Sequence, residues 1–483
     1  MDAVHQPGNG ARTLNVRMIL AAIAFLGTGA GGLVAQEPAT SALAEYVAKH
    51  DDAYGWVKRR EGIVGQTSYV ELILTSQSWR NTNWRHQLFV IKPAGVAEDT
   101  KHALLFITGG RWKDELEDPA GEDDRLPRQA NMFATLAAQV KTPIAVLLHV
   151  PHQPLFGGKN EDEIIAYTFE KFIQSGDSTW PLLLPMVKSA VRGMDAVQEL
   201  ARQDWSLDIE TFTVTGASKR GWTTWLTGAV DPRAAAIAPM VIDVLNMAPQ
   251  MKHQLAAWGS YSPQIHDYTE LGLQESLQSN PGARLQTIVD PFRYRQQLTQ
   301  PKLIMIGTND PYWPLDALNL YWDDLVGDKH ILYVPNNGHG LKDLVRVVGS
   351  LNALHQHTLR GAQLPTLDWT FAAGDDILTL RIASDPPPVE VRVWQATSPT
   401  RDFRTASWSS APTDQRDDGY VYDQQLPETG YAAIFGEAVY SGQPLPFFLS
   451  TNVRVVGADE VPAAGPAGPL RHAGTSPCLF RLP

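Results

Sequence analysis

Apolar segments of strand length alternate with helical segments through the middle of the chain. Six such segments predict strands, at 102–112, 142–151, 209–216, 234–243, 301–310 and 329–336. Amphipathic helices are expected between them at 129–140 and 182–201. Strands without polar alternation are typical of a parallel sheet that helices cover on both faces. The pattern therefore predicts an α/β fold with a doubly wound sheet.

Two further segments precede this series and have a different pattern. Residues 69–79 and 85–93 alternate apolar and polar side chains and predict two antiparallel strands joined by a short link. An antiparallel start followed by βα units is the layout of an α/β hydrolase, here over residues 40–364. The aromatic-rich stretch 243–300, between two predicted strands, is expected to form a lid or cap.

The pattern changes after residue 364. Short alternating segments with Pro, Gly and Asp turns follow at 376–384, 388–397, 418–426 and 431–440. They predict an all-β sandwich domain over 365–460. The Pro/Ala/Gly-rich tail at 461–483 is expected to be disordered.

The N-terminus is typical of an export signal. Arg12 and Arg17 precede an apolar run that ends in small residues near Ala35. A membrane anchor is the alternative, but the run is short and rich in glycine. We expect a signal peptide in residues 1–35 and a periplasmic or secreted protein that is not integral to the membrane after cleavage.

Composition excludes some classes of function. The net charge of -12 provides no basic face for nucleic acid. Because the chain has one cysteine, Cys478, an internal disulfide framework is excluded. The chain is 43% hydrophobic, which is enough for a large core.

A serine stands where a predicted strand turns into a helix. In the segment GASKRG, Ser218 lies between Gly216 and Gly221, with one residue more than the G-x-S-x-G pattern of a nucleophile elbow. The backbone N–H of Lys219 would supply one donor of an oxyanion hole. The segment FITGGRW offers a second donor from Gly110 or Arg111. An ordinary strand-to-helix turn is the alternative interpretation.

A nucleophilic serine needs a base and a carboxylate that orients it. Asp310 and His339 each follow a predicted strand, in the order Ser, acid, His that α/β hydrolases use. We therefore expect a Ser218–His339–Asp310 triad. Asp310 as a turn residue and His339 as a loop histidine are the alternatives, and Asp243 is an alternative acid.

Several other side chains are candidates for binding. Trp222 and Trp313 follow the serine and the acid and are expected to line the substrate site, together with Lys219. The Lys219 and Arg220 side chains could bind an anionic substrate group or form structural ion pairs.

Metal sites are weaker hypotheses. His149 and His152 could bind a metal, although a pair of histidines at a strand end explains them better. The acidic segment 113–125 could hold calcium, although a solvated loop explains it better. We expect no metal and no organic cofactor.

The motifs resemble those of a known family. The segments GASKRGWTTWLT, GTNDPYW, NNGHGL, ITGG and VPHQPL resemble the PhoPQ-activated pathogenicity-related proteins, over about residues 40–455. The resemblance implies an α/β hydrolase fold, export and an elbow serine at Ser218. The elbow is also similar to that of glucuronoyl esterases, G-C-S-R-x-G, with Ala217 in place of the cysteine and Lys219 in place of the arginine.

Together these features predict an exported serine hydrolase, with a carboxylic ester as the expected substrate. A peptidase of prolyl-oligopeptidase type, acting on short peptides, is a second hypothesis. A non-catalytic binding or signalling protein on a hydrolase scaffold is a third.

Overall fold

A computed structural model describes residues 41–121, 126, 128–374, 376–416 and 419–458. These residues belong to one compact unit. The export signal expected in residues 1–35, the tail expected at 461–483 and Cys478 lie outside the described residues.

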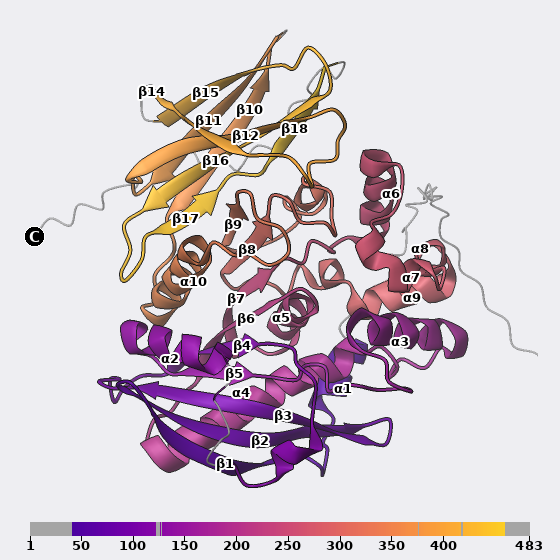
Figure 1. Ribbon diagram of the computed structural model, residues 1–483, viewed down its shortest axis with the longest axis vertical. Helices are drawn as coiled ribbons and strands as arrows, with labels where there is room; N and C mark the ends of the chain where they lie inside the picture. Colours follow the sequence, from indigo (N-terminus) through magenta and orange to yellow (C-terminus); the bar gives the residue numbers. More distant parts are fainter. Residues whose placement is uncertain (1–40, 122–125, 127, 375, 417–418, 459–483) are drawn as a thin grey trace, which may run out of the picture. The chain divides into compact units, whose positions relative to one another are not determined.

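A long sheet runs through the molecule (Figure 1). Its first nine strands are β1 (Gly55–Val64), β2 (Thr67–Trp79), β3 (Thr82–Pro93), β4 (His102–Ile107), β5 (Ile144–Leu147), β6 (Thr211–Ala217), β7 (Ala234–Met240), β8 (Lys302–Gly307) and β9 (Lys329–Val334). They are ordered β1-β2-β3-β5-β4-β6-β7-β8-β9. The pairs from β5 to β9 are parallel, and β1, β2 and β3 pair antiparallel. This arrangement confirms the predicted α/β-hydrolase sheet.

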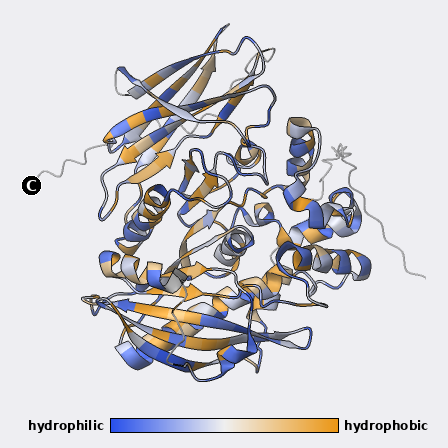
Figure 2. Ribbon diagram, in the orientation of Figure 1, coloured by the Kyte–Doolittle hydropathy of each residue, from blue (hydrophilic) through white to orange (hydrophobic). Residues whose placement is uncertain are grey.

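Helices cover both faces of the sheet. They are α1 (Ser41–Ala48), α2 (Arg128–Val140), α4 (Leu183–Trp205), α5 (Lys219–Val230) and α10 (Leu344–Leu359). A further helix, α3 (Glu161–Ser175), packs against the helices that lie between β7 and β8. α2 and α10 lie side by side on one face, and α1, α4 and α5 pack together on the other. The central strands are largely orange, that is hydrophobic, in Figure 2. Every residue of β5 and β8 is buried. The sequence analysis did not predict β1, α3 or α10.

The expected cap is a helical insertion between β7 and β8. It contains α6 (Met247–Trp258), η2 (Pro263–Ile265), α7 (His266–Thr269), α8 (Leu273–Ser276), α9 (Asn280–Val289) and η3 (Pro291–Tyr294). Two short 3₁₀ turns lie elsewhere, η1 (Asp114–Glu117) and η4 (Ala317–Leu320). Ser279 and Asp290 cap α9 and η3, each accepting a bond from a backbone N–H. These caps stabilise the short elements of the insertion.

The C-terminal strands form two antiparallel layers. They are β10 (Thr366–Ala373), β11 (Ile377–Asp385), β12 (Glu390–Ser398), β13 (Ser409–Pro412), β14 (Asp414–Arg416), β15 (Gly419–Gln425), β16 (Tyr431–Tyr440), β17 (Phe447–Ser450) and β18 (Arg454–Gly457). One layer is the sheet β10-β11-β15-β14, and the other continues the long sheet because β17 pairs with β9. A Cβ at Gly436 would lie 2.2 Å from Ile382 Cδ1, so the layers pack tightly there. The predicted β region is present, and its limits at 365 and 460 stay predictions.

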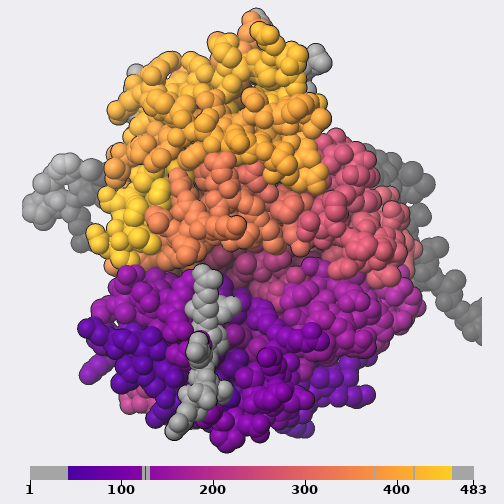
Figure 3. Space-filling model, viewed as in Figure 1, coloured from indigo at the N-terminus to yellow at the C-terminus, as the bar shows by residue number. Residues whose placement is uncertain are grey.

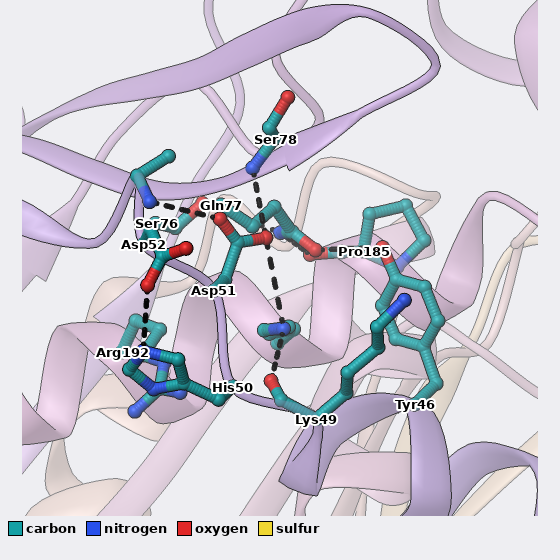
Figure 4. A network of polar contacts seen from close by, with 12 residues as sticks. Tyr46, Lys49, His50, Asp51, Asp52, Ser76, Gln77, Ser78, Pro185 and Arg192 are labelled. Atoms are coloured by element: carbon teal, nitrogen blue, oxygen red, sulfur yellow. Dashed lines mark hydrogen bonds and ion pairs between the residues drawn. The ribbon is translucent and has the colours of Figure 1, made fainter.

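Hydrogen bonds fix α1 against β2 and α4 (Figure 4). The Tyr46 hydroxyl donates to Gln77 Oε1 at 2.8 Å, and Gln77 Nε2 donates to the Pro185 carbonyl at 2.8 Å. Lys188 Nζ donates to the Lys49 carbonyl at 2.7 Å. The N-terminal helix is thus part of the hydrolase unit. Within the described ranges, no helix has the length and apolar character needed to cross a membrane.

Candidate active site

Ser218 occupies a sharp corner between β6 and α5. Its backbone angles, φ 59 and ψ -128, lie in a region that side-chain-bearing residues rarely adopt. A Cβ at Gly216 would lie 2.8 Å from the Arg220 carbonyl oxygen, and one at Gly221 would lie 2.7 Å from Ile242 Cγ2. Both glycines are therefore required for the corner. Although serine is a preferred helix cap, the Ser218 hydroxyl caps no N–H of α5 among the described residues.

His339 and Asp310 are brought together by the loops after β9 and β8. His339 Nδ1 lies 2.9 Å from Asp310 Oδ2, and the Asp310 side chain is 4% exposed. The other Asp310 oxygen accepts the Tyr312 N–H at 2.9 Å. The Tyr312 ring packs on the imidazole with centroids 4.2 Å apart. The His339 Nε2 atom is buried and has no hydrogen-bond partner among the described residues, which leaves it available to a reacting group.

The C-terminal strands hold both loops. The Asn309 side-chain amide donates to three backbone carbonyls, those of Phe403, Arg404 and Ala406, at 3.2, 3.3 and 2.8 Å. Asn336 exchanges two hydrogen bonds with the Trp408 backbone, at 2.9 and 2.8 Å. The segment 403–408 thus braces the residues beside Asp310 and His339.

Ser218 and His339 line one cavity of about 670 Å³ beneath the cap. Three other expected residues line it as well: Lys219, Trp222 and Trp313. The sequence analysis missed the rest of the lining: Asp162, Phe169, Val241, Ile242, Val244, Met247, Met251, Ile265, Tyr268, Leu273, Gln274, Leu277 and Tyr312. Of these, Tyr312 could have been found, because it lies two residues after the expected acid. The cavity is mostly apolar with a few polar groups, as small-molecule sites usually are.

The Lys219 and Arg220 side chains meet carboxylates at the start of α3. Lys219 Nζ lies 3.0 Å from Glu161 Oε2 and 2.9 Å from Asp162 Oδ2. Arg220 binds both Glu161 oxygens, at 2.7 and 2.8 Å. The Lys219 side chain is only 8% exposed. Of the two expected alternatives, an anion-binding site and structural ion pairs, this arrangement corresponds to the ion pairs. An anionic substrate group would have to compete with two carboxylates for Lys219.

The expected oxyanion donors differ in how the structure places them. Lys219 is the first residue of α5, where backbone N–H groups have no acceptor within the helix. The turn after β4 is close by, since a Cβ at Gly109 would lie 2.3 Å from Arg220 Nη2. Gly110 and Arg111 follow in this turn but lie outside the described lining of the cavity. Their role as donors stays a prediction.

Asp243, the alternative acid, is buried in a different setting. It lines a separate cavity of about 360 Å³ that also contacts Asp310. Burial raises its pKa to about 7. His339 is hydrogen-bonded to Asp310, which makes Asp310 the acid that the geometry favours.

The two histidines considered for metal binding have protein partners. His149 Nε2 lies 3.0 Å from Gln87 Oε1, and His152 Nδ1 lies 3.1 Å from the Arg85 carbonyl oxygen. Burial lowers the pKa of both imidazoles, that of His149 to about 4. In the acidic segment, Glu117 pairs with Arg85, and residues 122–125 lie outside the described ranges. Among the described residues, no group of three or more His, Cys, Asp or Glu could hold a metal.

Replacing Glu161 by glutamine should lower the free energy of unfolding by about 2 kcal/mol at pH 7. The change leaves Lys219 and Arg220 with one carboxylate fewer in a poorly solvated place. We expect less than for a fully buried pair, because the Glu161 side chain is 38% exposed. Glu163→Gln, which removes the surface pair with Lys159, is the matched control on the same helix and should cost under about 1 kcal/mol. Equal effects in urea unfolding would contradict the expectation.

The difference in stability between wild type and Glu161→Gln should also depend on pH. Burial alone would raise the pKa of Glu161. The hydrogen bond and positive charge of Arg220 and the charge of Lys219 outweigh this effect and lower the pKa to about 2, from an ordinary 4.5. A depressed carboxyl pKa stabilises the fold above the ordinary value and loses this effect as pH falls toward the folded value. The stability difference between wild type and Glu161→Gln should therefore be constant above about pH 5 and shrink toward pH 2. A difference that grows in acid would contradict it.

Comparisons with known proteins place the chain among related sequences. The family model for PhoPQ-activated pathogenicity-related protein matches residues 43–404. Autocrine proliferation repressor protein A of Dictyostelium discoideum is 30% identical over 435 residues, covering 82% of this chain and 85% of that protein.

Solved structures show a more distant likeness. Acetyl xylan esterase 1 of Thermoanaerobacterium sp. JW/SL YS485 has 15% identity and a TM-score of 0.45, with 66% of this chain and 94% of that chain covered. A glucuronoyl esterase of Solibacter usitatus has 12% identity and a TM-score of 0.35, with 63% and 88% covered. Acylaminoacyl peptidase of Pyrococcus horikoshii has 14% identity and a TM-score of 0.35, with 61% and 47% covered. These likenesses are too distant to carry an argument about function.

Proposed function

The chain belongs to the PhoPQ-activated pathogenicity-related protein family, and from this premise we propose that it is a serine hydrolase of carboxylic esters. The observation that carries the proposal is a shared cavity. The strained Ser218 lines it together with His339, whose imidazole is bonded to Asp310. Nucleophile, base and orienting carboxylate then follow in chain order, as in α/β hydrolases.

The proposed reaction has two acyl-transfer steps. Ser218 Oγ attacks the ester carbonyl carbon while His339 Nε2 takes the hydroxyl proton. The tetrahedral intermediate collapses, and the imidazolium gives this proton to the departing alkoxide, which leaves as the alcohol. Water then attacks the acyl-serine, again with His339 as base. The carboxylic acid leaves, and the proton returns to Ser218.

The surrounding groups support this charge movement. Asp310 accepts from His339 Nδ1, which presents Nε2 to the serine side and stabilises the imidazolium. The Lys219 N–H at the positive end of α5 is the first oxyanion donor in the proposal. The loss of one such donor typically lowers kcat by about 10²- to 10³-fold. The proposed chemistry uses the chain's own groups. We also propose that residues 1–35 direct export, and N-terminal sequencing of the mature protein would test this.

A non-catalytic signalling role is the second candidate function. Its support is the name of the Dictyostelium relative, which describes a repressor of proliferation. A fluorophosphonate probe separates the two, because it reacts with activated serines. We expect labelling of the wild-type protein at Ser218, mapped by peptide mass, and none of Ser218→Ala. Intact protein that neither labels nor cleaves a panel of aryl esters would overturn the hydrolase proposal, and cleavage confined to peptides would make it a peptidase.

A further inference from the structure

A second cavity opens beside the first, between α2 and α10. Its empty volume is about 1170 Å³, counting space that is open to solvent, and its lining includes His339 and Ala217, the residue before the elbow serine. His339 and Val241 also line the cavity beneath the cap, so the two cavities meet at the proposed catalytic groups. On the face seen in Figure 3, the surface is indented along the seam between the purple residues and the coral and orange residues.

The walls of this second cavity are apolar. Of the sixteen described residues that line it, only Thr135, Gln139 and His339 have polar side chains, and none is an acid, a lysine or an arginine. Of its lining residues, Met132 is 39% exposed and Leu344 is 52% exposed, so the cavity opens to solvent beside them. An uncharged, water-exposed cleft of this kind is stabilised when an apolar group fills it.

The cavity beneath the cap is also mostly apolar, but charged side chains take part in its lining. Asp162, Lys219 and Gln274 line it, and the Tyr268 hydroxyl donates to Asp162 at 3.0 Å. It therefore offers charged and polar groups on one side of the ester bond. Apart from His339, the only polar side chains of the α2–α10 cavity are the uncharged Thr135 and Gln139. An ester has two sides as well, an acyl group and an alcohol.

We propose that the α2–α10 cavity binds the acyl chain of the substrate, and that the enzyme prefers esters of medium or long acyl chains with a more polar alcohol. The inference rests on the proposed function, since it assigns the two cavities to the two halves of the ester. The chain would enter past Leu344 and reach the carbonyl carbon beside Ala217. Burial of each added methylene favours the transition state by up to about fourfold.

Acyl-chain selectivity tests the proposal. For wild type, kcat/KM on p-nitrophenyl esters should rise from acetate to octanoate. Val348→Trp places a large ring in the cavity and should lower the octanoate-to-acetate ratio of kcat/KM about 10²-fold. Val345→Trp is the matched control on the same helix, because Val345 is 47% exposed and outside the cavity lining, and it should leave the ratio unchanged.

Further arms locate the chain and guard against misfolding. Octyl acetate carries the long chain on the alcohol instead of the acyl group. If Val348→Trp lowers kcat/KM for octyl acetate but not for the octanoate ester, the acyl assignment is overturned. If Val348→Trp does not keep the wild-type melting curve, Leu344→Asp at the mouth should lower the same ratio about tenfold. An unchanged ratio in a folded variant would overturn the inference while leaving the hydrolase proposal intact.

A binding measurement separates failure of the inference from failure of the proposed function. Dodecanoate should bind the Ser218→Ala protein in calorimetry and bind the Ser218→Ala/Val348→Trp protein at least tenfold more weakly. This result would support the cavity even if no ester were cleaved. Absent or equal binding by the two proteins would count against it.

Discussion

Ser218→Ala should lower kcat for ester hydrolysis by about 10⁶-fold, because a triad without its nucleophile retains only binding and oxyanion stabilisation. The melting temperature should stay within about 2 °C of wild type. The hydroxyl is not used as a helix cap among the described residues, and alanine keeps the same Cβ at the strained corner. Steady-state kinetics on p-nitrophenyl butyrate and a thermal melt measure both quantities.

Ser350→Ala is a control for the loss of a serine hydroxyl. Ser350 is buried in α10 and donates to the Phe448 carbonyl at 2.9 Å. This variant should lose about 1 kcal/mol of stability and keep its turnover. The opposite pattern, with Ser218→Ala active, would remove Ser218 from the mechanism.

The parallel sheet could be predicted because each of its strands carries a local signal. Apart from Lys302, the residues of β5 and β8 are apolar on both faces, and the glycines that flank Ser218 mark the corner in the sequence. β1 gave no such signal. Its segment Lys58–Glu61 is charged and partly exposed, as is common at the edge of a sheet, where charges prevent further pairing.

The contacts that shape the candidate site are long-range, and this is why sequence reasoning missed them. Glu161 pairs with Arg220, which lies 59 residues away in the sequence, and nothing in either segment predicts this ion pair. The α2–α10 cavity joins helices more than 200 residues apart. The pairing of β9 with β17, at Ile331 and Ser450, likewise joins distant parts of the sequence. A spacing pattern cannot report which distant surfaces will pack.

The order of serine, acid and histidine was visible in the sequence, and it already favoured Asp310 over Asp243 as the acid. Asp243 and Asp310 both follow apolar strands and both are buried. The structure adds the 2.9 Å contact of Asp310 Oδ2 with His339 Nδ1. The structure also shows that Asn309 and Asn336 bind the backbone of segment 403–408 and so hold the two loops. No sequence motif predicts these contacts.

Asp310→Asn should lower kcat by about 10⁴-fold with little change in KM. An amide at this position can donate to the imidazole and hold it in the tautomer that cannot accept the serine proton. The expected size of the loss is taken from the same aspartate-to-asparagine change in the triad of serine proteases. A chromogenic ester at pH 7 and a melting curve for each variant are sufficient measurements.

Asp243→Asn is the matched variant, because it makes the same chemical change at the other buried carboxyl. Burial raises the pKa of Asp243 to about 7, from an ordinary 3.8, so the folded protein holds this proton over a range in which the unfolded chain has lost it. Stability then falls as pH rises from about 4 to about 7. Asparagine is neutral throughout and should remove this decline, with kcat within about threefold of wild type. If Asp243→Asn instead abolishes turnover and Asp310→Asn does not, the acid follows β7, and the Asp310–His339 contact has a structural role only.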